Sequence, residues 1–339
     1  MRTLKSVAVA GAGSIGCFVG GMLRAGGHPV SLLARPRLIE DINRHGLKVT
    51  SFEGIEHRLT PAEIKLSDDP APLFADADIV LVTVKSDDTT EIADLIAQHA
   101  AKDAVIVSLQ NGTGNVSVLR EALPDHDVLA GMVPFNVLSL GEGHFHRATS
   151  GDILLEKDDP DIAKLLSQPQ LVFRSVDDIE GVQWGKLLIN LNNALNALSG
   201  LPLRDQLARR SWRILFADQM REALAVIKAE GIAPVSTTPL PASFTPFILK
   251  LPDALFTKIA ASMVKIDPKA RSSMWEDLQR SRRTEIDHLQ GLIVTLAERH
   301  GLRAPLSARI VALIREAEQA GKGSPGLTPE QIRSPVRSG

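Results

Sequence analysis

The sequence predicts an α/β protein in which a doubly wound parallel sheet is followed by an all-α C-terminal domain. Over the first half of the chain, short apolar runs alternate with segments of helical spacing, which indicates parallel strands joined by crossover helices. From about Asp177 the apolar runs stop and long helical periodicities follow. We therefore expect a sheet domain over residues 1–176, a helical domain over 177–320 and a mobile tail over 321–339, which is poor in apolar residues.

Each expected strand is a short apolar run, and each expected helix repeats its apolar residues at helical spacing. In the first domain we expect strands at Val7–Ala10, Val30–Ala34, Asp78–Val84, Val105–Leu109, Met132–Val137 and Asp152–Glu156, and helices at Cys17–Ala25 and Glu91–Ala101. In the second domain we expect helices at Lys186–Leu198, Ser211–Glu230 and Glu285–His300. The proline-rich segment Thr237–Pro252 is expected to be a loop or a change of direction.

The motif GAGSIG at residues 11–16 follows the first expected strand and opens a helix. In that context the first glycine allows a tight turn, the second lets the backbone approach a pyrophosphate, and the third lets the helix pack closely on the strand. The alternative is a purely structural glycine turn. The context favours a Rossmann-type domain that binds a dinucleotide through Gly11, Gly13, Ser14, Ile15 and Gly16.

The end of the second expected strand indicates which dinucleotide binds. NAD enzymes usually carry Asp or Glu there for the ribose hydroxyls. This chain has Arg35 instead, and a guanidinium suits a 2′-phosphate through a forked, charged contact. The alternative is a solvated surface arginine. The absence of an acid at this position predicts NADPH/NADP as the cofactor.

Polar residues also follow the next two strands. Lys85 comes directly after the run DIVLVTV, and Asn111 lies in the sequence QNGTGN after the Val105 strand. Ligands of open α/β sheets bind outside the carboxyl ends of the strands. We therefore expect Gly11, Gly13, Arg35, Lys85 and Asn111 to line one crevice, although Asn-Gly is also an ordinary turn signal.

The helical half contains a stripe of polar residues. On a helix, Lys186, Asn190 and Asn193 fall within roughly 60° of each other, while the opposite face is apolar. Asparagine is a poor helix former, so four asparagines in one short helix need a reason, and hydrogen bonds to a ligand would supply one. The alternative is a surface helix with a polar side.

Further on, Ser273 and Glu285 are candidates with structural alternatives. Ser273 and Glu276 have capping-box spacing, and Glu285 suits the first turn of a helix. Twelve residues on one straight helix span about 18 Å. If Ser273 and Glu285 both touch one small substrate, the chain must therefore break or bend between them, and Thr284 is the expected helix cap after that break.

Taken together, these motifs resemble the ketopantoate reductase (2-dehydropantoate 2-reductase) family over nearly the whole chain. The matching pieces are GAGSIG, VTVK, LQNG, WGKLLIN and SSM followed by RRTEID. The resemblance implies a Rossmann domain followed by a helical domain, with the substrate held between them. It also implies hydride transfer from NADPH to a small branched 2-oxo acid, namely 2-dehydropantoate reduced to pantoate in pantothenate biosynthesis.

The resemblance assigns roles to residues of the helical half. Lys186 matches the catalytic lysine that donates a proton to the forming alkoxide, and Asn190 matches a substrate-binding asparagine one turn on. Ser273 matches a serine that holds the substrate carboxylate. Glu285 matches the glutamate that contacts the substrate hydroxyl, so Lys186 and Glu285 are the expected catalytic residues.

In the first half, Asn111 matches an asparagine near the nicotinamide and the substrate, and Arg35 and Lys85 match groups at the 2′-phosphate end of the cofactor. The chain departs from the family at Ala194, where the family often has a second substrate asparagine. Asn193 is expected to substitute for it because it points closer to the Lys186 face. The departure concerns the identity of the substrate more than the reaction type.

Composition excludes several other functions. The chain has 339 residues with 38 basic and 40 acidic side chains, a balance that favours neither nucleic acid nor an anionic membrane as partner. Cys17 is the single cysteine, so no intrachain disulfide forms. No apolar stretch is long enough for a signal peptide or a membrane span. We expect a cytoplasmic monomer or homodimer with a small-molecule substrate and no metal.

Three alternatives remain. One is a related Rossmann and helical dehydrogenase that acts on a hydroxyacyl thioester, an imine, or another 2-oxo or 2-hydroxy acid; the pairing of Lys186 with Glu285 argues against it. Another is a non-catalytic NADP-binding sensor, which the retention of all candidate catalytic side chains disfavours. The third is a methyltransferase that holds S-adenosylmethionine on a glycine-rich loop, which Arg35 disfavours because no ribose-binding acid stands there.

Overall fold

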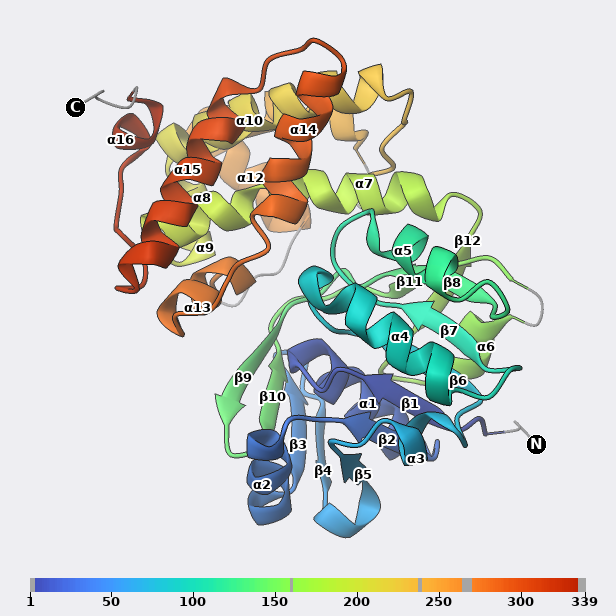
Figure 1. The fold of residues 1–339 in the computed structure, drawn as a ribbon. Helices are drawn as coiled ribbons and strands as arrows, with labels where there is room; N and C mark the ends of the chain where they lie inside the picture. Colours follow the sequence, from blue (N-terminus) through green and yellow to red (C-terminus); the bar gives the residue numbers. More distant parts are fainter. Residues whose placement is uncertain (1–3, 159–160, 237–239, 264–269, 335–339) are drawn as a thin grey trace. The chain divides into compact units, whose positions relative to one another are not determined.

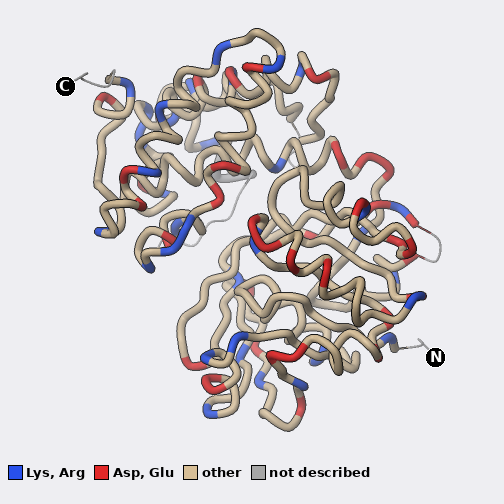
Figure 2. Tube along the Cα trace, in the orientation of Figure 1, with Lys and Arg blue, Asp and Glu red and all other residues tan. Residues whose placement is uncertain are grey.

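The computed structural model describes residues 4–158, 161–236, 240–263 and 270–334. The chain divides into two compact units, residues 1–180 and 181–339, so the boundary lies close to the expected one at 176. Each unit has its own hydrophobic core. Figure 2 shows Lys and Arg interspersed with Asp and Glu along both units.

The first unit is built on an eight-stranded sheet of order β12-β11-β8-β7-β6-β1-β2-β5 (Figure 1). All neighbouring strands pair in parallel except β11, which runs antiparallel to β8. This order confirms the predicted doubly wound sheet, with its switch point between β1 and β6. The strands are β1 Val7–Ala10, β2 Val30–Leu33, β5 Lys65–Ser67, β6 Ile79–Val82, β7 Val105–Ser108, β8 Val128–Met132, β11 Ile153–Glu156 and β12 Phe173–Val176.

The strands at the switch point are buried throughout, and α1 packs against β1 and β2. All residues of β1 and β6 are at most 1% exposed, which explains why they read as continuous apolar runs rather than alternating ones. The helices of this unit are α1 Ser14–Ala25, α2 Pro36–His45, α3 Ala71–Phe74, α4 Thr89–His99, α5 Asn115–Ala122 and α6 Ile162–Leu166, with short 3₁₀ turns at Pro61–Glu63 and Ser86–Asp88.

A second, four-stranded sheet in this unit was not predicted. It has the order β4-β3-β10-β9 and packs against α1. Half-exposed strands such as Glu56–Leu59 carry a weak apolar pattern, so the sequence gives little sign of them. Its strands are β3 Leu47–Ser51, β4 Glu56–Leu59, β9 Val137–Gly141 and β10 His144–Arg147.

The prediction of one strand over Met132–Val137 is wrong. Met132 ends β8 and Val137 begins β9, so the chain leaves the large sheet and enters the small one between them. Pro134 lies in this connection and has no N–H to offer a strand ladder. The apolar run therefore marks the end of one strand and the approach to another.

The second unit is helical, and its described residues contain no strand. Leu187, Leu191 and Leu195 are at most 1% exposed and form part of its core, as the predicted packed face requires. No helix in the described part of the chain is long and apolar enough to cross a membrane. The helices are α7 Ile179–Asn190, α8 Asn192–Ser199, α9 Leu203–Ala208, α10 Arg210–Ala229, α11 Thr245–Leu249, α12 Asp253–Met263, α13 Ser273–Gln279, a π-helix at Asp287–Gly291, α14 Leu292–Arg299, α15 Pro305–Ala320 and α16 Pro329–Arg333.

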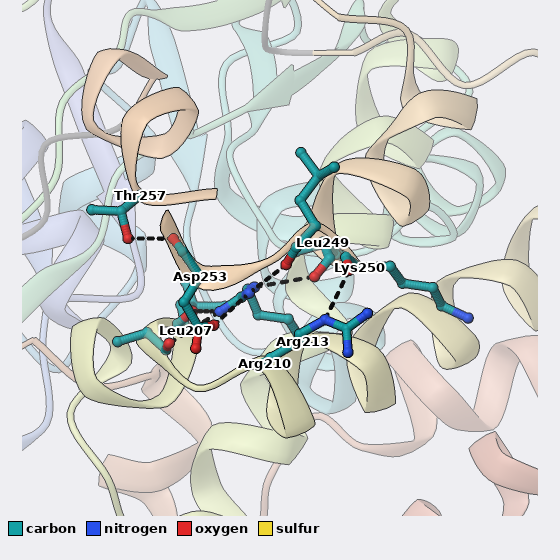
Figure 3. Close-up of polar contacts among 9 residues, drawn as sticks. Leu207, Arg210, Arg213, Leu249, Lys250, Asp253 and Thr257 are labelled. Carbon is teal, nitrogen blue, oxygen red and sulfur yellow. Dashed lines mark hydrogen bonds and ion pairs between the residues drawn. The ribbon is translucent and has the colours of Figure 1, made fainter. Parts of the chain in front are cut away.

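The proline-rich segment is more ordered than predicted. Residues 237–239 lie outside the described part, but a 3₁₀ turn at Ala242–Phe244 and α11 follow. Arg213 of α10 anchors the end of α11 (Figure 3). Its buried guanidinium donates to the carbonyls of Leu207, Ala208, Leu249 and Leu251 and to the Asp253 carboxylate, so all five N–H groups are used.

Residues 321–334, which were expected to form a mobile tail, make contacts with the rest of the helical unit. Leu327 N–H donates to the carbonyl of Leu198 at 2.8 Å, and the Ser324 hydroxyl donates to that of Ala197 at 2.6 Å. Thr328 caps α16, whose Ile332 is completely buried. The few apolar residues of this segment are thus enough to hold it, because each lies against the helical core. Residues 335–339 lie outside the described part.

Candidate active site

The glycine turn after β1 has the geometry that the motif predicts. Gly11 has φ +108°, and a Cβ there would lie 2.9 Å from the backbone nitrogen of Val84. A Cβ on Gly16 would lie 2.9 Å from Val9 Cγ1 and 2.6 Å from Thr83 Oγ1. The first and third glycines are therefore required by the turn and by the close packing of α1 on β1.

The second glycine faces open space. No described atom lies within 4 Å of a Cβ built on Gly13, although its φ of −79° would accept any residue. Gly13 is also the N-cap of α1, where no side chain caps the helix and no acidic residue lies in the first turn. The backbone N–H groups at this N-terminus, including those of Ser14 and Ile15, fit the pyrophosphate of a dinucleotide.

Sequence reasoning missed Thr83, which holds the glycine turn in place. Its hydroxyl donates to the carbonyl of Gly11 at 2.6 Å, which connects the ends of β1 and β6 across the switch point. A hydroxyl residue near the end of an otherwise apolar run was the available signal.

Arg35 lies at the end of β2, as predicted, where it is the N-cap residue of α2. Its side chain is 92% exposed, and its Nη2 lies 3.9 Å from Oδ2 of Asp88, which ends the 3₁₀ turn that follows β6. Lys85 follows β6 and is half-buried. The structure therefore places both basic residues at the same edge of the sheet as the glycine turn.

A buried amide network supports the turn that carries Asn111. Gln110 donates to the Thr89 hydroxyl at 2.8 Å, which donates in turn to the side-chain oxygen of Asn115 at 3.0 Å. Asn115 then donates to the carbonyl of Asn111 at 2.6 Å. Asn111 itself is exposed at the end of β7, so the network positions its backbone and leaves its side chain at the surface. Sequence reasoning missed Gln110 and Asn115, although both lie in the quoted QNGTGN.

In the helical unit, Lys186 is half-buried on α7, and burial lowers the pKa of its ammonium group to about 8. The helix begins at Ile179, seven residues before the expected start, and is interrupted at Leu191. The interruption is slight, because Leu191 keeps helical dihedrals and its N–H still donates to Leu187. The predicted alignment of Lys186, Asn190 and Asn193 is therefore retained.

The four asparagines of this segment divide into two pairs. Asn192 and Asn196 have structural partners, since both donate to the side-chain oxygen of Gln206 in α9. Asn190 and Asn193 have no side-chain hydrogen bond to any described residue, although Asn190 is only 7% exposed. Hydrogen bonds within the described part of the protein therefore account for Asn192 and Asn196 but not for Asn190 and Asn193.

Ser273 is the first residue of α13 and is exposed. The interpretation of Ser273 as a cap is wrong, because Ser272 caps the helix by accepting from the N–H of Trp275 at 3.1 Å. The Ser272 hydroxyl also donates to the carbonyl of Asn193 at 2.9 Å. This contact brings the start of α13, and with it Ser273, to the turn that carries Asn193.

The predicted break between Ser273 and Glu285 is confirmed. Gln279 ends α13, and the next helical element is the π-helix that begins at Asp287. Thr284 accepts from the N–H of Ile286 at 3.3 Å, in the manner of a cap. Glu285 is half-buried and precedes the π-helix, so it does not lie in a helical first turn.

The π-helix is tied to the helix that carries Lys186. Gln290 is completely buried and donates to the carbonyl of Leu191 at 2.8 Å, where α7 and α8 meet. π-Helical turns occur frequently at functional sites. No local sequence pattern indicates this contact, because it joins residues 99 positions apart. The contacts of Ser272 and Gln290 thus tie the segments that carry Ser273 and Glu285 to the helices that carry Lys186, Asn190 and Asn193.

Comparison with known proteins gives a consistent assignment. The family described as ketopantoate reductase PanE/ApbA matches residues 7–159, and its C-terminal counterpart matches residues 178–318. The 2-dehydropantoate 2-reductase of Halobacterium salinarum is 26% identical over 324 residues, which cover 93% of this chain and 99% of the relative. That of Archaeoglobus fulgidus is also 26% identical, over 93% of this chain and 98% of the relative.

Similar solved structures include a member of the same family. A PanE/ApbA family ketopantoate reductase from Ralstonia eutropha is 32% identical with a TM-score of 0.77, over 94% of this chain and 99% of that one. D-mandelate dehydrogenase, solved with NADH and anilino(oxo)acetate, has the same TM-score at 20% identity, over 94% of this chain and 100% of that one; this likeness concerns the fold. The chain belongs to the ketopantoate reductase PanE/ApbA family and is an oxidoreductase that uses a nicotinamide cofactor.

Proposed function

We propose that this chain reduces a small branched 2-oxo acid with NADPH, and that the acid is ketopantoate (2-dehydropantoate), which becomes pantoate. The observation that carries the proposal is Lys186, an amine with a pKa of about 8, one turn from Asn190, whose side chain has no hydrogen bond to any described residue. An amine of that pKa is largely protonated at neutral pH yet releases its proton readily. The relatives named 2-dehydropantoate 2-reductase support the choice of substrate.

The first unit supplies the cofactor site. The N-terminus of α1 would hold the pyrophosphate, with Gly11, Gly13, Ser14, Ile15 and Gly16 around it. Arg35 and Lys85 would bind the 2′-phosphate, and Asn111 would lie toward the nicotinamide. The reduced nicotinamide, when bound, supplies a hydride to the keto carbon of the substrate.

The second unit supplies the proton and orients the acid. Lys186 donates a proton to the keto oxygen as negative charge develops there, and its positive charge stabilises that oxygen. Asn190, Asn193 and Ser273 donate hydrogen bonds to the substrate carboxylate and keto group. Glu285 accepts a hydrogen bond from the hydroxyl of ketopantoate, which selects a hydroxylated 2-oxo acid over one without the hydroxyl.

The direct test is NADPH oxidation by the purified protein with ketopantoate, with branched 2-oxo acids lacking the hydroxyl, and with no acid. We expect turnover on ketopantoate with kcat/KM at least about tenfold above the acids without the hydroxyl. A chain that binds NADPH but oxidises it with none of these acids is a sensor rather than a reductase.

A related 2-oxo acid is the second candidate, and Ala194 is the observation that favours it. Where the family often has a substrate asparagine, this chain has a completely buried alanine. Asn193 would have to make the missing contact from the neighbouring position. The same panel of acids decides, because the second candidate predicts that ketopantoate is not the best substrate.

We further infer that the enzyme works in the cytoplasm as a monomer or homodimer. A ketopantoate reductase from Staphylococcus aureus is described as dimeric, and it shares this fold at 18% identity with a TM-score of 0.67. Light scattering of the purified chain measures its state directly, and a mass above two chains contradicts the proposal.

A further inference from the structure

Asp88 stands at the start of α4 but does not cap it. Aspartate is among the residues most favoured at an N-cap, because its carboxylate accepts from the free N–H groups of the first turn. Asp88 is the N-cap residue of α4, yet its side chain makes no cap hydrogen bond. Its Oδ2 instead lies 3.9 Å from Nη2 of Arg35.

A second basic residue and a helix N-terminus lie beside Arg35. Arg35 is the N-cap of α2, whose first turn holds no acidic residue and contains Arg37, which is exposed. The N-terminus of a helix adds partial positive charge. Figure 2 shows the acidic stretch at the start of α4, and Asp88 is the residue of that stretch that pairs with Arg35.

Asp88 therefore has opposite effects on the two nicotinamide cofactors. A 2′-phosphate bound by Arg35 would carry close to two negative charges. It would be repelled by the Asp88 carboxylate, which lies 3.9 Å from the same guanidinium. The 2′-hydroxyl of NADH is neutral and can donate a hydrogen bond to the same carboxylate, as it does to the acid at the end of the second strand in NAD enzymes. In this chain the acid comes from the 3₁₀ turn after β6 instead.

We propose that Asp88 is a specificity-determining residue that lowers the preference for NADPH over NADH. The inference rests on the proposed role of Arg35 at the 2′-phosphate. Arg35 attracts the phosphate, and Asp88 offsets part of that attraction and serves the ribose of NADH. The pair sets a moderate preference where Arg35 alone would set a strong one.

The test is Asp88→Asn, with Kd for NADPH and NADH measured by fluorescence titration. We expect roughly three- to tenfold tighter NADPH binding, the size of one exposed charge–charge interaction with a dianion. NADH binding stays the same or weakens, so the ratio of the two constants widens. Because both side chains are exposed, the gain in NADPH affinity should shrink as salt is raised.

The matched control is Asp103→Asn, which removes the same charge from an exposed residue. Asp103 precedes β7 and therefore lies at the amino end of that strand, away from the carboxyl ends that carry Arg35 and Asp88. It should leave both constants unchanged. Arg35→Ala separates this inference from the proposed function. If Arg35→Ala fails to weaken NADPH binding, the assignment of Arg35 fails. If Arg35→Ala narrows the preference but Asp88→Asn leaves it unchanged, or tightens both cofactors equally, Asp88 does not set specificity.

Discussion

The glycine turn of the first unit and the polar cluster of the helical unit are built in different ways. The cluster consists of Lys186, Asn190, Asn193, Ser273 and Glu285. The turn is made of backbone: Gly11, Gly13 and Gly16 shape it, and contacts across neighbouring strands hold it. The cluster is made of side chains, held by contacts such as those of Gln290 and Ser272. Changes in the turn should therefore alter cofactor affinity, and changes in the cluster should alter turnover.

The largest expected effect is that of Lys186→Ala on turnover. Loss of the proton donor should lower kcat by roughly 10²–10⁴-fold. NADPH affinity should be unchanged, because the residues proposed to bind the cofactor all lie in the first unit. Steady-state kinetics with a parallel NADPH titration separate the two, and Lys258→Ala, an exposed lysine on α12, is the matched control. Near-normal turnover of Lys186→Ala would mean that the polar stripe is a solvated helix face.

Gly13→Ala tests the opposite half of the comparison. The added methyl group lies more than 4 Å from every described protein atom outside its chain neighbours and its own helix, and the backbone at Gly13 is unstrained, so thermal unfolding should be unchanged. The methyl group would occupy the space assigned to the pyrophosphate, and Kd for NADPH should rise roughly tenfold or more, the effect of overpacking by about 1–3 kcal/mol. Unaltered NADPH affinity would move the pyrophosphate away from this turn.

Gln290→Leu tests whether the π-helix positions the cluster. Loss of the hydrogen bond to Leu191 should lower kcat about tenfold or more, because small displacements of reacting groups are costly, and NADPH affinity should not change. The matched control is Gln219→Leu, since Gln219 is also completely buried but has no side-chain partner among the described residues. Equal losses of turnover in the two variants would indicate general damage to the core.

The smallest expected effects distinguish the two pairs of asparagines. Asn190→Ala should raise KM several-fold and leave the free energy of unfolding nearly unchanged. Asn192→Ala should lower the free energy of unfolding by about 1–3 kcal/mol, because it removes the acceptor of the buried Gln206 side-chain nitrogen, while the Gln206 oxygen keeps its bond from Asn196. Urea unfolding of both variants measures this difference in stability. The division into a structural pair and a ligand pair is contradicted if Asn190→Ala is the less stable variant.

The same contrast explains what could be predicted from the sequence. The strands at the switch point, the glycine turn and Arg35 follow local rules, because buried strands are apolar runs and a turn needs glycine at fixed positions. Gln290 and Ser272 act through partners 99 and 79 residues away, which no local pattern records. Asn192 and Asn196 were grouped with Asn190 and Asn193 because composition cannot tell a structural amide from a ligand.

The most direct test of the account is the pH dependence of kcat for reduction. Lys186 must be protonated to act, so kcat should be level below pH 8 and fall tenfold per pH unit above the pKa of about 8. The free energy of unfolding gives an independent readout. The pKa of Lys186 is about 8 in the folded protein and 10.5 for an unperturbed lysine, so the unfolded chain binds more protons between these values and stability rises with pH there. Lys186→Met should lack that rise. A kcat that stays level to pH 10, with a stability that rises equally in wild type and Lys186→Met, would contradict the assignment of Lys186 as the proton donor.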